Sequence, residues 1–260
     1  MIGIVVVSHS PALARAAVDL SLEMVGESPP AIAIAAGAGE GVIGTDAVKV
    51  AEAIDEVASG DGVLVFMDLG SAVLSGTMAT EFMTTRDEVR LTDSPFVEGL
   101  IAAVVLANAG ASLDEVDREA RAAMGAKQSQ LAGQGEAPAV EPAAASVDSS
   151  NSDSSAASSN AATAALFEIS AEAPLINPDG LHSRPAAAIV QALAKVEAKV
   201  TITDVTSGKG PVAANSLIGI MSLGATKDHV VKFSATGAAA QDAVDLLVAM
   251  AADGFGELGS

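Results

Sequence analysis

Short apolar runs alternate with segments of helical periodicity along the first half of the chain. The apolar runs predict strands at residues 3–7, 31–35, 62–67 and 89–91, with helices between them. Such alternation is typical of α/β domains with a parallel sheet. The pattern therefore predicts a small doubly wound domain with flavodoxin-like strand order.

Several short motifs predict where the helices of this half begin. Ser10-Pro11 and Ser94-Pro95 each combine an N-cap serine with a first-turn proline. Ser112 followed by Glu115 has the spacing of a capping box.

The second half has a different pattern, which predicts an α+β open-faced sandwich. Strands are expected at 166–172 and, after a helix that begins near Pro185, in the segment KVTITDV. TSGKG then predicts a turn. A short helix at 216–221, a strand at 230–234 and an amphipathic helix at 241–251 complete the pattern.

Residues 129–165 separate the two halves and contain no Lys, Arg or aromatic residue and no apolar periodicity. This composition predicts a disordered linker between domains at 1–128 and 166–260. As a flexible coil of about 37 residues it would span roughly 30–35 Å, enough for the two domains to meet.

Composition narrows the class of protein further. A chain of 260 residues with 50% hydrophobic content can bury two cores. The absence of cysteine excludes disulfide scaffolds, thiolate catalysis and sulfur-ligated zinc, and it fits a cytoplasmic location.

The apolar run near the N-terminus is too short for a signal peptide or a membrane span. A net charge of −20 disfavours nucleic acid and anionic membranes, so proteins or small molecules are the expected partners.

Two residues whose side chains could take part in a reaction follow neighbouring strands of the predicted sheet. His9 comes directly after the first strand and Asp68 after the third, so both should lie in the crevice at the switch point. A carboxylate that accepts a hydrogen bond from one imidazole nitrogen leaves the other nitrogen as a neutral nucleophile.

The segments around these residues favour an anion as the ligand. Ser10 precedes a helix start, and Gly70 and Ser71 open the helix after Asp68, where free N–H groups can bind phosphate. The glycine-rich segment 37–46 could line the same rim. A Ser71–His9–Asp68 hydrolase is the rival interpretation, but the sequence has no G-x-S-x-G motif and we rank it lower.

A second candidate site lies in the other half, where His182, Ser183 and Arg184 cluster just before Pro185. The N-terminus of a helix favours phosphate, and Arg184 adds a charged donor. The third histidine, His229, is expected to be a surface residue.

GLHSRPAA and SGKGPVAANSLIGIMSLGA resemble the histidine-containing phosphocarrier HPr over about residues 166–255. The resemblance implies that His182 carries a phosphoryl group on Nδ1 and that Arg184 neutralises it. Ser216 matches a serine that some bacteria phosphorylate, although a serine beside a short helix is usually a cap.

IVVVSHSPALA, IGTDAVKVAEAI and VLVFMDLGSAVLS resemble mannose-type IIA domains, and most closely those of the DhaM family of dihydroxyacetone kinase subunits. The resemblance implies a relay from phosphoenolpyruvate through a separate enzyme I to His182 and His9. The final acceptor would be ADP on a DhaL subunit, for dihydroxyacetone bound to DhaK.

The same resemblance implies a homodimer through the N-terminal domain. No cofactor or metal is expected on this chain, because magnesium would accompany the ADP on the partner. Whether a free HPr can serve as donor is left open. A IIA component for sugar transport and a phosphorylation-dependent regulatory module remain the alternatives.

Overall fold

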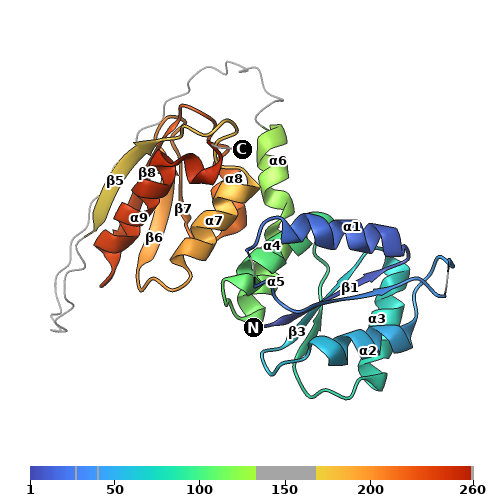
Figure 1. Cartoon of the computed structure of the whole chain (residues 1–260). Coiled ribbons are helices and arrows are strands. Elements are labelled where there is room, and N and C mark those ends of the chain that lie inside the picture. The colour runs from blue at the N-terminus through green and yellow to red at the C-terminus, as the bar shows by residue number, and fades with distance from the viewer. Residues whose placement is uncertain (27, 40, 133–167, 259–260) are drawn as a thin grey trace, which may run out of the picture.

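The structure is a computed structural model that describes residues 1–26, 28–39, 41–132 and 168–258. Figure 1 shows two β-sheets, one in the N-terminal part (residues 1–132) and one in the C-terminal part (residues 168–258), each with its own helices. Within these ranges no helix is both long and apolar enough to cross a membrane.

The first sheet is parallel and contains β1 (Gly3–Ser8), β2 (Ile32–Ala36), β3 (Val63–Met67) and β4 (Val89–Leu91). Their order is β2-β1-β3-β4, so the chain reverses direction across the sheet between β2 and β3. This is the predicted flavodoxin-like order, with β1 and β3 as neighbours.

Helices cover both faces of this sheet because successive strand residues point to opposite sides. Ile4 and Val6 pack with α1 (Pro11–Leu22), α4 (Phe96–Asn108) and α5 (Leu113–Ala122). Val5 and Val7 pack on the other face with α2 (Ala47–Val57) and α3 (Gly70–Phe82). The central strand is therefore buried on both sides, which explains its unbroken apolar run.

Two of the predicted helix starts are confirmed and one is wrong. Ser10 caps α1 with Pro11 as its first residue, and Ser112 and Glu115 form the capping box of α5. In α4 the N-cap is Pro95 rather than Ser94. Proline fixes φ but leaves ψ free to be extended, and the Pro95 carbonyl accepts the first helical hydrogen bond from Gly99 N–H at 2.8 Å.

The predicted linker starts too early, because α6 (Met124–Ala132) continues the helical structure through residues 129–132. The start of this helix packs on the core, because Ala126 and the preceding Ala123 are both buried. Residues 133–165, the rest of the predicted linker, lie outside the described residues.

The second sheet is antiparallel in the order β5-β8-β6-β7. Its strands are β5 (Ile169–Pro174), β6 (Lys199–Asp204), β7 (Lys209–Ala213) and β8 (Val230–Thr236). The helices α7 (Ser183–Leu193), α8 (Leu217–Ser222) and α9 (Ala240–Ala252) accompany it, which is the predicted open-faced sandwich. A 3₁₀ turn at Gly254–Gly256 follows α9.

The sequence pattern did not predict β7. The first two residues of this strand, Lys209 and Gly210, belong to the predicted TSGKG turn. This strand contains Gly210 and Pro211, which normally interrupt strands. Both are tolerated because β7 lies at the edge of the sheet and pairs on one side with β6. At the other edge, Leu166 and Phe167 of the predicted first strand lie outside the described residues.

The two parts contact each other through α4, α5 and α6 on one side and α7 and α8 on the other. Glu119, nearly buried in α5, accepts hydrogen bonds from Ser216 Oγ and Ile218 N–H, both at 2.7 Å. Gln191 Nε2 donates to Met24 O at 2.8 Å. The Glu119 carboxylate thus binds the N-terminus of α8, where negative charge is favoured.

His229 is partly exposed and also makes a contact that the sequence did not predict. Its Nδ1 lies 2.8 Å from Oδ2 of Asp204, a carboxylate without exposed surface. The carboxylate also accepts hydrogen bonds from the N–H groups of Thr206 and Ser207 and from the Ser207 hydroxyl. Burial alone would raise the pKa of Asp204, but these hydrogen bonds together lower it.

We predict that Asp204→Asn lowers the free energy of unfolding of the C-terminal part by about 2 kcal/mol, because an amide group then faces donors that need acceptors. A carboxyl with a lowered pKa stabilises the fold above its unfolded value, about 3.9, and loses this effect as pH falls through the folded value. The difference in the free energy of unfolding between wild type and variant should therefore become smaller below about pH 4. Thermal melts followed by circular dichroism at pH 7 and pH 3 test this, with Asp228→Asn as the exposed control. Equal melting temperatures at pH 7 would contradict the prediction.

Candidate functional site

The register of β1 and β3 brings His9 and Asp68 to the same edge of the first sheet. Val7 pairs with Met67, the last residue of β3, and β1 ends one residue later at Ser8. Asp68 N–H donates to Val7 O at 3.2 Å, which holds the two strand ends together. From this edge α1 begins after His9 and α3 begins after Asp68, so helix N-termini lie on both sides of the pair.

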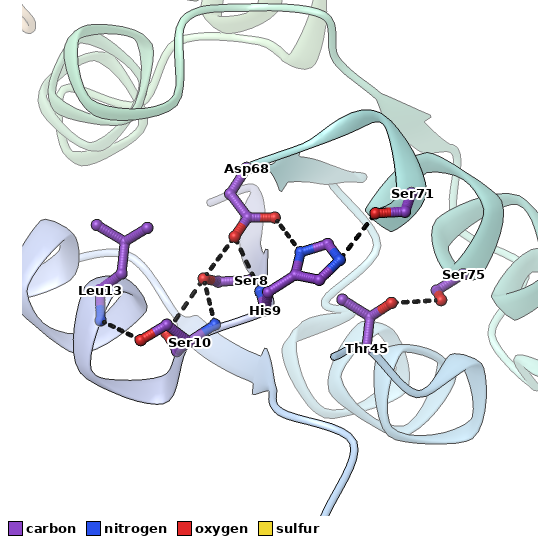
Figure 2. Close-up of polar contacts among 8 residues, drawn as sticks. All are labelled: Ser8, His9, Ser10, Leu13, Thr45, Asp68, Ser71 and Ser75. Atoms are coloured by element: carbon purple, nitrogen blue, oxygen red, sulfur yellow. Dashed lines mark hydrogen bonds and ion pairs between the residues drawn. The ribbon is translucent and has the colours of Figure 1, made fainter. Parts of the chain in front are cut away.

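Both oxygens of the Asp68 carboxylate bind the segment around His9 (Figure 2). Oδ1 lies 2.9 Å from His9 Nδ1, while Oδ2 accepts from His9 N–H at 2.8 Å and from the Ser8 hydroxyl at 2.9 Å. The Asp68 side chain is only 6% exposed, compared with 19% for that of His9. Three contacts from two adjacent residues therefore fix both the ring and its backbone.

The charge of Asp68 follows from this environment. Burial raises the pKa of Asp68, but the hydrogen bonds from the His9 backbone, the His9 ring and the Ser8 hydroxyl outweigh burial and lower it. The carboxyl is therefore ionised at neutral pH and acts only as an acceptor. An acceptor opposite Nδ1 keeps the imidazole proton on Nδ1 and leaves the lone pair on Nε2.

The Nε2 atom of His9 faces the beginning of α3. Ser71 Oγ lies 2.8 Å from it, and Figure 2 shows the hydroxyl on the side of the ring opposite Asp68. Ser71 is the second residue of α3 and follows the exposed Gly70. Amides in the first turn of a helix lack intrahelical acceptors, so this end of α3 offers donors to an anion bound at Nε2.

The predicted rim segment does approach the site, although sequence reasoning did not identify its residues individually. Gly44 N–H donates to His9 O at 3.2 Å, and the hydroxyls of Thr45 and Ser75 are 2.7 Å apart, which ties the segment to α3. Ser8 was also missed as a functional candidate. Its position beside His9 in the SHS motif was the available signal.

Ser10 has a structural role, because it caps the N-terminus of α1. Its hydroxyl accepts from Leu13 N–H at 3.3 Å as the N-cap of α1, and its own N–H donates to Ser8 Oγ at 3.1 Å. Ser10 thereby fixes where α1 starts relative to His9.

The linked side chains Ser71, His9 and Asp68 also have the connectivity of a hydrolase triad. A serine nucleophile on a strand-to-helix turn is normally held in a strained backbone conformation. Ser71 instead has the helical backbone of α3, and the described non-glycine residues with positive φ are Asp228 and Phe255. The geometry therefore fits a serine that assists His9 better than one that attacks a substrate.

The second candidate cluster lies at the start of α7, with His182 as N-cap and Ser183 as first residue. The His182 Nε2 atom is 2.8 Å from Oε1 of Glu257, a residue that the sequence did not single out. Arg184 Nη2 lies 3.5 Å from Glu23 Oε2 in the N-terminal part, with both side chains largely exposed. Ser183 lines a cavity of about 160 Å³ between α4, α6 and α8.

The structure thus keeps the two histidines apart. His9 precedes the N-terminus of α1, whereas Glu23, the contact of Arg184, follows its C-terminus. A helix of 12 residues is about 18 Å long. In the described ranges no group of three or more His, Cys, Asp or Glu side chains is arranged to hold a metal ion.

Comparisons with known proteins match both parts of the chain. Residues 3–117 match the family model described as PTS system fructose IIA component, and residues 169–253 match the model described as PTS HPr component phosphorylation site. The fusion of a IIA part with an HPr part that the sequence suggested is therefore confirmed.

Individual relatives agree with these models. A protein of Klebsiella michiganensis named PEP-dependent dihydroxyacetone kinase, phosphoryl donor subunit DhaM, is 35% identical over 99% of this chain and 51% of its own. The protein of the same name from Escherichia coli is 36% identical over the same shares. The chain spans about half the length of these two relatives.

A shorter relative is covered more completely. The Listeria innocua protein named PEP-dependent dihydroxyacetone kinase 2, phosphoryl donor subunit DhaM, is 36% identical over 107 residues, which are 40% of this chain and 85% of that protein. With both halves matched in this order, the chain belongs to the DhaM family of phosphoryl donor subunits.

Proposed function

We propose that this chain is a phosphoryl carrier that receives phosphate on His182 and passes it to His9. The observation that carries the proposal is the His9 ring, whose Nδ1 is held by an ionised Asp68 while Nε2 faces the N-terminus of α3. A neutral imidazole with one fixed proton is a competent nucleophile and a good leaving group near neutral pH.

The transfer step needs few protein groups. The His9 Nε2 lone pair attacks phosphorus while the bond from phosphorus to His182 Nδ1 breaks, and the electron pair of that bond returns to His182. Because the transition state is loose, positioning and charge do most of the work. Asp68 stabilises the positive charge that the His9 ring gains, and Ser71 with the first amides of α3 can bind the phosphoryl oxygens.

The names of the relatives support a specific place for this relay. We infer that enzyme I donates to His182 and that His9 donates to ADP on a DhaL-type subunit for dihydroxyacetone bound to DhaK. A free HPr would take the place of the fused C-terminal part as donor to His9. Magnesium would accompany the nucleotide on that partner. A homodimer and a cytoplasmic location belong to the same proposal. Sugar transport and regulation are less well supported, because the relatives that match over 99% of the chain are named as kinase subunits.

The domain arrangement adds a requirement to the relay. The C-terminal part contacts the C-terminal end of α1, about 18 Å from the end that bears His9. In-line attack requires reacting atoms within about 3–3.5 Å. The C-terminal part must therefore leave α4–α6 before His182 can reach the His9 ring of the same chain.

The order of transfer is the first test of this function. With enzyme I and labelled phosphoenolpyruvate, label should appear on His182 before His9, because His182 lies in the part that matches HPr. His182→Ala should abolish labelling of His9 in the absence of a separate HPr, whereas His9→Ala should leave labelling of His182 intact. Label on His9 at the wild-type rate in His182→Ala would contradict the relay, and label on Ser71 would favour the hydrolase-like chemistry.

Asp68→Asn tests the carboxylate. We predict that the rate of transfer to His9 falls by about 10- to 100-fold, as for other residues that orient a reactive imidazole, because the amide lacks the charge and presents N–H to Nδ1. Rapid-quench measurement with an excess of phosphorylated HPr checks this. Asp61→Asn serves as a control, since Asp61 is exposed and precedes β3, at the opposite end of this strand from Asp68. An unchanged rate in a folded Asp68→Asn protein would remove Asp68 from the site.

A cross-link tests the required domain movement. The chain has no cysteine, so Met24→Cys with Gln191→Cys can be joined by a short bismaleimide across the contact that the native residues make. Because His182 then stays near the C-terminal end of α1, transfer from His182 to His9 should fall at least 100-fold at low protein concentration.

Adding a separate HPr should restore labelling of His9 in the cross-linked chain, because the His9 crevice is untouched. Each single-cysteine variant treated with the same reagent is the control and should relay normally. A cross-linked chain that relays at the wild-type rate would show that no movement is needed.

A further inference from the structure

The chain after α9 forms an unusual turn. Gly254, Phe255 and Gly256 have φ values of 62°, 55° and 79°, so three consecutive residues occupy the left-handed region. Glycine enters this region freely, but a phenylalanine does so only where the surroundings impose it. Strained backbone of this kind is concentrated at functional sites.

The turn delivers Glu257 to the ring of His182. Glu257 N–H donates to Gly254 O at 3.1 Å, and the Glu257 Oε1 atom lies 2.8 Å from His182 Nε2. Both side chains are mostly buried, 19% and 32% exposed. The pair is an electrostatic contact rather than a hydrogen bond.

A buried amide holds the Glu257 carboxylate in place. Asn177, without exposed surface, donates from Nδ2 to Glu257 Oε2 at 2.9 Å and to Gly180 O at 2.7 Å. His182 N–H donates to the same Gly180 carbonyl at 3.0 Å. One side chain thus connects the carboxylate with the backbone that carries His182.

Gly180 is itself fixed by close packing. Its φ is 67°, and a Cβ atom at this position would lie 2.2 Å from Ala225 O. The loop between Asn177 and His182 therefore has little freedom to adjust. The carboxylate, the amide and the imidazole form a preset arrangement rather than a chance surface contact.

We propose that Glu257 is the positioning residue of His182. Its carboxylate favours the imidazole tautomer with the proton on Nε2, which leaves the Nδ1 lone pair as the nucleophile. As the bond to phosphorus forms, the ring gains positive charge, and the adjacent carboxylate stabilises it. The inference rests on the proposed role of His182 as a phosphoryl acceptor and adds the residue that prepares it.

The test measures phosphorylation of the whole chain with two donors, phosphorylated enzyme I and the small molecule phosphoramidate. In Glu257→Ala the rate of phosphorylation of His182 should fall about tenfold with both donors, as when other orienting carboxylates are removed. With enzyme I the loss should appear in kcat rather than KM, since Glu257 acts on the ring. Glu257→Gln keeps an oxygen acceptor without the charge and should give an intermediate rate.

The ring itself can be observed without any donor. Nitrogen-15 NMR of the neutral His182 ring should show almost only the Nε2–H tautomer in the wild type, and the mixture of a free imidazole in Glu257→Ala. Asp253→Asn, on the same turn with an exposed side chain, is the matched control and should change neither rate nor tautomer. Thermal melts show whether each variant is folded.

The outcomes separate the two proposals. A wild-type chain that takes no phosphate on His182 from either donor contradicts the relay. A wild-type chain that is phosphorylated normally, with Glu257→Ala equal to it in rate and tautomer, overturns the role of Glu257 alone. A loss with enzyme I only would also overturn it, because it would indicate a docking residue.

Discussion

The contact between a carboxylate and one nitrogen of an imidazole determines what the N-terminal part can do. Asp68 reaches His9 only because β1 and β3 are parallel neighbours that end together, with Val7 opposite Met67. The sheet order thus places this contact between the starts of α1 and α3. Buried apolar strands provide the rigidity, and a single ionised side chain selects the nitrogen that remains available.

The same requirement for positioning explains why the C-terminal part would have to separate from the N-terminal part in the proposed relay. Glu119 binds the start of α8 through two short hydrogen bonds. Arg184 forms an exposed ion pair with Glu23. Such a contact is polar at its edges, with exposed pairs that contribute little to stability. An interface of this kind can open, as the proposed relay between the two histidines requires.

Much of the first site could be predicted from the sequence because it depends on local rules. Strand ends are visible in apolar runs, and neighbouring parallel strands bring His9 and Asp68 together whatever the loops do. Glu257 could not be found in this way: it lies 75 residues after His182 and reaches it only through a left-handed turn that no periodicity reveals. The strand β7 was missed for a related reason, since its Gly210 and Pro211 are acceptable only at the edge of the sheet.

The two histidines also differ in which ring nitrogen faces a carboxylate, and this difference suits the proposed relay. His9 has its carboxylate at Nδ1 and presents Nε2, whereas His182 has its carboxylate at Nε2 and presents Nδ1. A carboxylate on the far side of each ring stabilises the charge of that ring without competing for the phosphoryl group, which is itself anionic. In the proposed in-line transfer, the two nitrogens that do not face a carboxylate lie on opposite sides of one phosphorus atom, with both carboxylates behind their rings. The negative charges are kept as far apart as the two imidazoles allow, so repulsion between them opposes the encounter least.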